Sequence, residues 1–312
     1  MSVALRTAVI AFVMSILDAP VSAHVDAVVS PDRLWKAWTF EPLIVLSILI
    51  TGVTYAHGVR RLWAHAGSGR GVSYARALAF AAGEGALLLA LISPLDALGG
   101  TLLSAHMAQH GLLVGVAPPL LLLGRPSVAF AWLLGRSAPS HPSATMMWRS
   151  VNAFARELAT PLGATMLQGV VLWIWHAPAL FDAALEHEWL HAMEHLCFFV
   201  SALLFWEVLL NCRSGRHSAA AFAAAFVTFM HSGLLGGLIT MAPAPLYLSY
   251  VGRTESWGLN ALEDQQLAGL FMWLPLGLPY LVAGLVLASG LVLKGPEDPG
   301  TRRLPVSSVS QR

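Results

Sequence analysis

Charged residues are scarce in this chain of 312 residues. Asp, Glu, Lys and Arg make up 11% of the sequence, whereas hydrophobic residues make up 56%. A soluble domain carries about 25% charged residues, so the composition excludes an ordinary soluble protein. Apolar runs recur along the chain, each near the roughly 20 residues that are needed to cross a bilayer. The sequence therefore indicates a multi-pass membrane protein in contact with a lipid bilayer.

Cysteine is rare as well, since the chain has only Cys197 and Cys212. They map to opposite sides of the predicted bilayer, too far apart for a disulfide, and no CxxC pair suggests a thiolate metal site. There is no Gly-rich nucleotide-binding loop, no Ser-His-Asp signature and no convincing internal repeat. These absences give no support to an enzymatic activity and weigh against an inverted-repeat transporter.

The apolar runs predict an all-α, polytopic bundle of seven transmembrane helices. The fourth predicted span is short, and Pro275 and Pro279 predict a kink in the seventh. The seven predicted spans are Pro42–Val59, Tyr74–Ile92, Ser104–Leu123, Pro161–His176, Trp189–Leu210, Ser218–Met241 and Ala268–Leu293.

The N-terminus has the pattern of a secretory signal. Arg6 precedes the apolar run Thr7–Leu17, and small residues follow up to Ala23. This pattern predicts a cleaved signal peptide over residues 1–23, with an uncleaved anchor as the alternative. We expect residues 24–41 to be an external segment and 42–293 to be the membrane domain. The Pro-, Ser- and Arg-rich residues 294–312 are expected to form a disordered cytoplasmic tail.

Basic residues predict the orientation of the bundle. Of 18 Lys and Arg, one precedes the N-terminal apolar run, 14 fall on one side of the predicted membrane, and only Arg33, Lys36 and Arg253 fall on the other. Cytoplasmic loops carry the excess of Lys and Arg, so we predict that the mature N-terminus is external and the C-terminus cytoplasmic. The net charge of +1 reflects this asymmetry and gives no reason to expect a nucleic-acid partner.

Histidines gather at the predicted outer end of the bundle, to which eight of the twelve map. His106 and His110 open the third span, and a four-residue spacing places both on one helix face. The fifth span opens with three histidines at the same spacing, and Glu194 lies on their flank. His176 closes the fourth span, and His231 lies in the outer half of the sixth. The three histidines of the fifth span are His187, His191 and His195.

Two histidine pairs at matched depth favour a bound metal. Imidazole is the commonest protein ligand of transition metals, whereas a lone histidine at a helix end is more often an interfacial residue. Met107 and Met193 accompany the histidines, and thioethers with imidazoles select copper, in particular Cu(I). The alternative for these methionines is ordinary gap filling in a helix bundle.

Three other polar residues lie at membrane depth. Glu84 in the second span is either a proton-accepting group or the partner of a neighbouring helix. Gln168 is expected to form a hydrogen bond between helices. Asp264 is either the N-cap of the last span or a partner that orients a ligating histidine.

Four segments that carry these residues resemble the motifs of the CtaG family of integral-membrane cytochrome c oxidase assembly proteins. The resemblance extends, with the motifs in the same order, from about Pro42 to Leu293. Phe181 stands where the family motif often has tyrosine. The four segments are His106–Pro126, Trp175–Leu185, Leu190–Trp206 and Asp264–Pro275.

The resemblance implies a helix bundle in a bacterial inner (plasma) membrane that helps to mature a haem–copper oxidase, at a copper-delivery step. The implied partners are the catalytic subunit of the oxidase and a periplasmic copper donor. Two alternatives stay open: a b-type haem protein with axial histidines, and a copper or proton-coupled transporter that uses Glu84 as a relay. The residues carried over from the family motifs are His106, His110, His176, His191, His195 and Asp264.

Overall fold

The computed structural model describes residues 28–133, 157–212 and 216–293. The predicted signal peptide and the predicted tail lie outside the described residues. Within them the chain is helical and has no strand, as predicted.

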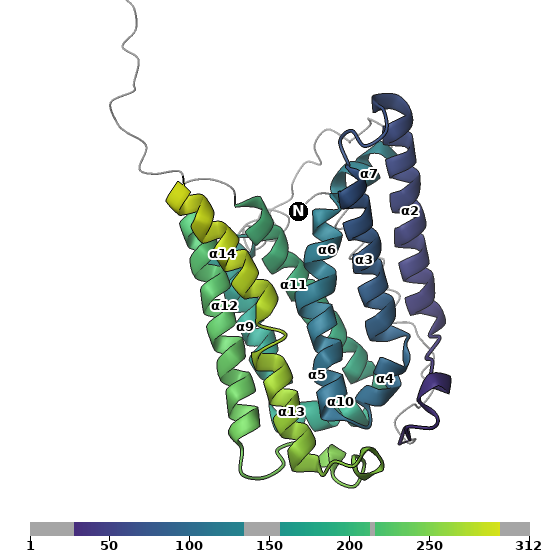
Figure 1. The fold of residues 1–312 in the computed structure, drawn as a ribbon, viewed down its shortest axis with the longest axis vertical. Helices are drawn as coiled ribbons and strands as arrows, with labels where there is room; N and C mark the ends of the chain where they lie inside the picture. Colours follow the sequence, from purple (N-terminus) through teal and green to yellow (C-terminus); the bar gives the residue numbers. More distant parts are fainter. Residues whose placement is uncertain (1–27, 134–156, 213–215, 294–312) are drawn as a thin grey trace, which may run out of the picture.

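The long helices run side by side along the longest axis of the molecule (Figure 1). Four of them are α2 (Pro42–Ala66), α3 (Tyr74–Leu91), α11 (Glu188–Asn211) and α12 (Arg216–Met241). Two further spans are each divided in two, Leu103–Leu123 into α5 and α6, and Ala261–Gly290 into α13 and α14.

Six spans in the described residues are long and apolar enough to cross a membrane. A seventh is reached only if α9 (Pro161–Trp175) and α10 (Pro178–Glu186) are joined across a bend of 72°. The predicted fourth span ended at His176, and α9 by itself has only 15 residues. Its shortness was therefore predicted correctly, but the chain then turns sharply into α10 at the end of the bundle.

The third span is irregular because proline interrupts it. Helix α5 (Leu103–Gly111) leads into a π-helical turn, Leu112–Val116, before α6 (Ala117–Leu123). Pro118 has no N–H to donate to the carbonyl of Val114 four residues earlier. The indole Nε1 of Trp206 in α11 donates to that carbonyl instead, at 2.9 Å. A neighbouring helix thus satisfies a backbone group that would be costly to leave unpaired in the bilayer.

The last span is broken at the predicted place. Helix α13 (Ala261–Trp273) ends before Pro275, and α14 (Leu278–Leu293) begins after it. Helices α12 and α13 approach closely on the side facing the bundle: a Cβ added to Gly236 would lie 2.7 Å from the carbonyl oxygen of Gly269. A larger residue at Gly236 would force the two helices apart.

Short elements close the predicted external end of the bundle. Helices α4 (Pro94–Gly99) and α10 lie there, together with the segment 242–260 and its two turns, Leu248–Tyr250 and Glu255–Trp257. Trp257 donates from its indole Nε1 to the carbonyl of Val29, 2.7 Å away. This contact fixes the segment 242–260 to the chain that precedes the first span.

The opposite end contains a helix that the sequence did not predict. No predicted span lies between residues 124 and 160, but Pro126–Leu133 forms α7. Helix α7 packs against α2 where Gly58 leaves room, since a Cβ there would lie 2.1 Å from the carbonyl oxygen of Ala129.

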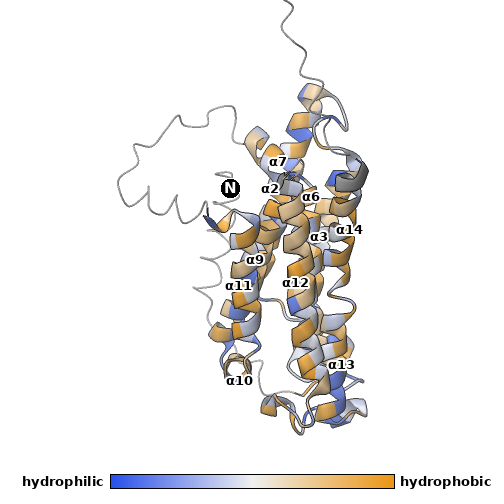
Figure 2. Ribbon diagram, turned by 90° about the vertical axis from the view of Figure 1, so that its left-hand side faces the viewer, coloured by the Kyte–Doolittle hydropathy of each residue, from blue (hydrophilic) through white to orange (hydrophobic). Residues whose placement is uncertain are grey.

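The outer faces of the helices are apolar, as a lipid environment requires. Leu78 of α3 is 71% exposed and Leu285 of α14 is 62% exposed. Figure 2 shows mostly hydrophobic residues along the middle of the helices and hydrophilic residues toward their ends. The polar residues buried inside the bundle are therefore the unusual feature of this fold.

The orientation of the bundle gives a first testable prediction. In a chain whose Cys197 and Cys212 are replaced by alanine, a cysteine at exposed Ala244 is expected to react with a membrane-impermeant maleimide in intact cells. A cysteine at exposed Ser68 should react only after the membrane is opened. The reverse labelling pattern would contradict the predicted orientation of the bundle in the membrane.

A second prediction concerns the irregular third span. Trp206→Phe removes the donor to the Val114 carbonyl and is expected to destabilise the protein by about 1–3 kcal/mol, the cost of an unsatisfied buried polar group. Unfolding in detergent micelles measures this loss. Trp189→Phe is the control, because Trp189 is 61% exposed and its replacement should change stability by less than about 0.5 kcal/mol. Equal stability of the two variants would contradict the assigned role of Trp206.

Candidate metal centre

Helices α5 and α11 bring four imidazoles together near the predicted external end of the bundle. The rings of His106 and His110 have centroids 4.3 Å apart, and those of His191 and His195 are 4.2 Å apart. Between the helices, the His106 and His191 centroids are separated by 5.2 Å, and the His110 and His195 centroids by 5.5 Å. The two pairs, separated by about 80 residues of sequence, form one cluster.

Three of these rings are close enough to share an ion. One nitrogen each from His106, His191 and His195 lies within 4.8 Å of the other two. A ring nitrogen binds a first-row metal at about 2.0–2.1 Å, so two nitrogens on one ion lie no more than about 4.2 Å apart. Side-chain movements of under about 1 Å would bring all three onto one ion.

A buried carboxylate completes the cluster. Glu194 is fully buried, and its two oxygens lie 3.8 Å from His106 Nε2 and 3.7 Å from His110 Nε2. These distances are longer than hydrogen bonds. His106, His110 and Glu194 form a second group whose ligand atoms lie within 4.8 Å of one another.

The polar atoms at the centre of the cluster have no hydrogen-bond partner among the described residues. This holds for the Nε2 atoms of the four clustered histidines and for both oxygens of Glu194. Leaving so many buried polar atoms unpaired is costly, and a carboxylate in apolar surroundings is the costliest of them. A cation bound among the members of either group of three would pair with several of these atoms, so the residues present fit a metal ion.

Tyr250 orients one of the rings. Its hydroxyl donates to the carbonyl of Gly99 at 2.7 Å, and its oxygen lies 3.2 Å from His106 Nδ1. Burial raises the pKa of Tyr250 well above its ordinary value, so the hydroxyl stays neutral. With its single hydrogen committed to Gly99, the oxygen accepts from Nδ1–H of His106. This tautomer leaves Nε2 of His106 free as a ligand.

Asp264 positions the helix that carries two of the histidines. Its carboxylate accepts from the backbone N–H groups of Leu103 and Ser104 at 2.6 and 3.2 Å, and from the Ser104 hydroxyl. It therefore caps the start of α5, and the interpretation as a direct partner of a histidine is wrong. The N-cap of α13 itself is Asn260, in a capping box with Glu263.

His176 lies beside the cluster but faces another way. Its ring is buried, 5.8 Å from that of His110. Its Nδ1 is 2.7 Å from the carbonyl of Leu172, and its Nε2 is 3.4 Å from the sulfur of Met107. Met107 thus approaches His176, and the structure does not place either of them at the centre of the cluster.

The remaining predicted site residues are more distant. His187 is exposed at the start of α11, and its ring lies 3.0 Å from the carbonyl of Ala183. His231 lines a cavity beside the cluster, together with His110 and His176. Met193 packs in an apolar group with Trp175 and Phe198. Glu84 faces Gly52 of α2, where an added Cβ would lie 3.9 Å from its carboxylate.

Sequence reasoning missed Tyr250 and its neighbour Tyr247, which donates to the carbonyl of His176 at 3.0 Å. A weak signal existed, because two of the five tyrosines of the chain stand three residues apart in one predicted external loop. The helix–helix hydrogen bond expected of Gln168 is present, from its Nε2 to the hydroxyl of Tyr280.

A comparison with known families identifies the chain. The profile of a family described as cytochrome c oxidase caa3 assembly factor matches residues 53–293, which include every residue of the cluster. The chain belongs to this family. Membership supports a role in the assembly of a cytochrome c oxidase, and the resemblance noted from the sequence motifs is confirmed.

Curated relatives of this caa3 assembly-factor homologue are mycobacterial proteins described as uncharacterized. Mb0105 of Mycobacterium bovis and MT0111 of Mycobacterium tuberculosis are each 25% identical over 266 residues, or 82% of the chain. ML1998 of Mycobacterium leprae is 23% identical over 257 residues. The chain spans about two fifths of the length of these relatives, 40% for the first two. No solved structure matches the chain.

The hydrogen bond from His106 to Tyr250 gives a third prediction. Tyr250→Phe removes the oxygen that fixes the His106 tautomer while the ring still fills its space. We expect metal affinity to fall by about 10–100-fold, the usual effect of removing an outer partner of a ligand, as measured by competition with a chelator. Tyr247→Phe is the control, since Tyr247 is equally buried but contacts a backbone carbonyl. If both variants bind metal as tightly as the original chain, Tyr250 does not orient a ligand.

Proposed function

We propose that this protein binds copper at the cluster of His106, His110, His191, His195 and Glu194 and passes it to a cytochrome c oxidase during assembly. Copper is the cargo of the protein in this proposal, and no substrate is turned over. The observation that supports it best is the buried carboxylate surrounded by imidazole nitrogens that lack hydrogen-bond partners.

The ligand set favours copper in its reduced state. Imidazoles suit copper, zinc, iron and nickel, so the histidines alone do not select one metal. The single carboxylate of Glu194 balances the charge of one Cu(I) ion, which leaves a neutral site in apolar surroundings. A divalent ion would leave a net positive charge there, which is costly without further compensation. The catalytic subunit of a haem–copper oxidase also requires copper.

The histidines of α11 form an access route along one helix face. His187 is exposed, His191 is partly exposed, and His195 is buried, at successive intervals of four residues. Side chains at this spacing lie one above another. Copper from a periplasmic donor would meet His187 first and the buried part of the cluster last.

Two alternative functions have less support. A haem between the two histidine pairs needs a ligand pocket of several hundred Å³, but the cavity next to the rings measures about 40 Å³. A proton-coupled transporter would use Glu84 as a relay. Glu84 lies on α3 and does not line that cavity, so it has no visible link to the cluster.

The fourth prediction tests copper transfer in cells that depend on this protein. His191→Ala combined with His195→Ala should leave the protein in the membrane, because insertion depends on apolar length. The cluster of this variant is expected to lose copper affinity by more than about 100-fold, since removal of an outer partner already costs about 10–100-fold. Oxidase activity and oxidase-bound copper should fall under copper limitation.

His57→Ala combined with His65→Ala is the matched control, because both residues are exposed on α2, away from the cluster. This control should support normal oxidase assembly. Full oxidase activity in the α11 variant under copper limitation would exclude a transfer role and favour a scaffold. A strong visible absorption band of the purified protein would instead support haem binding.

A further inference from the structure

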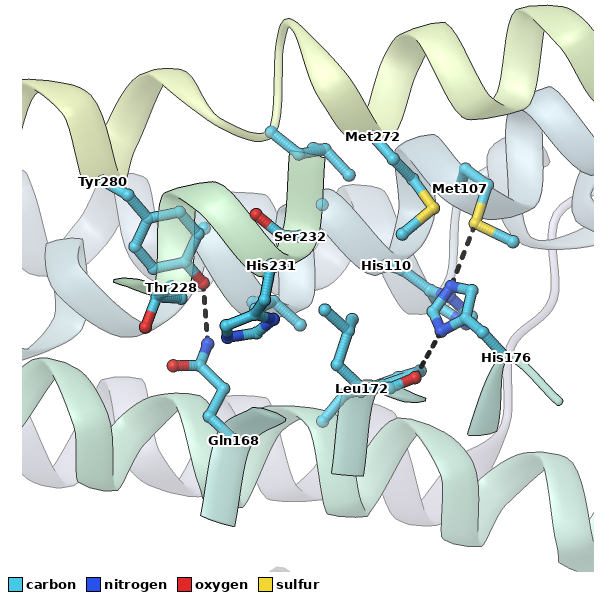
Figure 3. A pocket seen from close by; sticks show the side chains of 15 residues that line it. Met107, His110, Gln168, Leu172, His176, Thr228, His231, Ser232, Met272 and Tyr280 are labelled. Atoms are coloured by element: carbon cyan, nitrogen blue, oxygen red, sulfur yellow. Dashed lines mark hydrogen bonds between the residues drawn. The ribbon is translucent and has the colours of Figure 1, made fainter. Parts of the chain in front are cut away.

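A cavity of about 40 Å³ lies inside the bundle, beside the histidine cluster. It is formed by α5 and the π-helical turn that follows it, by α9, α11, α12 and α13, and by the start of α14. His110 belongs both to the cluster and to the wall of this cavity. Along α9 the wall continues from His176 through Leu172 to Gln168, on successive turns, toward the middle of the predicted membrane (Figure 3). The cavity therefore leads inward from the cluster.

The protonation of His176 follows from its contacts. A backbone carbonyl can only accept, so Nδ1 of His176 must carry the proton that it donates to Leu172. In the neutral ring Nε2 then carries a bare lone pair.

This lone pair faces the sulfur of Met107 at 3.4 Å. A thioether sulfur is an acceptor and carries no proton, so no hydrogen bond joins the two atoms in this tautomer. Two ligand atoms held about 2.0 and 2.3 Å from one ion and 3.4 Å from each other enclose an angle close to tetrahedral. The pair thus has the spacing of two ligands on one metal ion.

A second thioether lies at the same cavity. Met272 of α13 is buried and lines the wall together with Met107. Figure 3 shows the sulfur atoms of both methionines turned toward the cavity, from the same side of the His176 ring. All three ligands are neutral and the two thioethers are soft, so the set favours Cu(I) over zinc and over Cu(II).

We propose that Met107, Met272 and His176 form a second Cu(I) site, distinct from the cluster and deeper in the bundle. The identity of the metal rests on the proposed function. His110 connects the two sites, since its ring lies 5.5 Å from that of His195 and 5.8 Å from that of His176. Movement of the ion exchanges one set of ligands for another, and no electron is transferred.

The test uses the full chain, purified in detergent without oxygen and titrated with Cu(I) in competition with a chelator. X-ray absorption then reports whether sulfur ligates the bound copper. We expect two ions for each chain, with a clear sulfur contribution. Met107→Leu combined with Met272→Leu, a nearly volume-conserving change, should remove one ion and the sulfur contribution. Without copper, the variant should stay folded with only a small loss of thermal stability.

Two other variants separate this site from the cluster. His191→Ala combined with His195→Ala should remove the other ion and leave the sulfur-ligated one. Met241→Leu is the control for methionine loss, because Met241 is 82% exposed, and it should bind both ions.

The outcomes distinguish the two proposals. One bound ion that lacks sulfur and is unaffected by the two Met→Leu changes would overturn the second site and leave the cluster in place. One sulfur-ligated ion that survives the α11 changes would support the second site while the cluster proposal fails. An unchanged sulfur contribution in the double Met→Leu variant would also overturn the assignment of these residues.

Discussion

A carboxylate buried among imidazoles is the constraint on which the rest of the structure depends. Glu194 is fully buried, within 4 Å of the Nε2 atoms of two histidines. Ionisable groups at membrane depth are expensive and persist where they have a function. The surrounding helices shield this group from lipid, since α5 is buried on nearly all sides and its apolar Leu103 and Met107 are as fully covered as His106.

The irregular parts of the fold satisfy the polar groups that this arrangement creates. Asp264 caps the start of α5, so the two histidines that follow are held on a fixed helix. The indole N–H of Trp206 donates to the Val114 carbonyl, which lacks a backbone donor because of the proline in the third span. Tyr250 fixes one ring through its hydroxyl. Sites supported on rigid elements in this way keep their ligands close to binding geometry.

The cluster and the adjacent cavity differ in their chemistry. The cluster combines imidazoles with the acidic side chain of Glu194, and the exposed His187 lies on the same helix, α11. The cavity beyond His110 offers neutral, softer ligands on α5, α9 and α13. An ion moving inward would thus exchange a charged, partly accessible site for a neutral, enclosed one. Under the proposed function, such a gradient would hold copper away from water before its release, in keeping with a family of oxidase assembly factors.

The sequence by itself determined the class of fold, the approximate spans and the histidine pairs. These features are local: apolar length defines a span, and a spacing of four residues places His106 beside His110 whatever the rest of the chain does. Matched depth then predicted that the pairs of α5 and α11 would meet, and they do.

Only the tertiary structure decided which partners lie across the bundle. Asp264 caps a helix 160 residues earlier in the chain, and Tyr250 reaches a histidine 144 residues away. The helix α7 packs on α2 through contacts with Gly58 that no periodicity reveals. The direction of His176, away from the cluster and toward Met107, likewise depends on how α9 ends beside α5. Such contacts depend on how whole helices are placed relative to one another. A local sequence pattern carries no information about that placement.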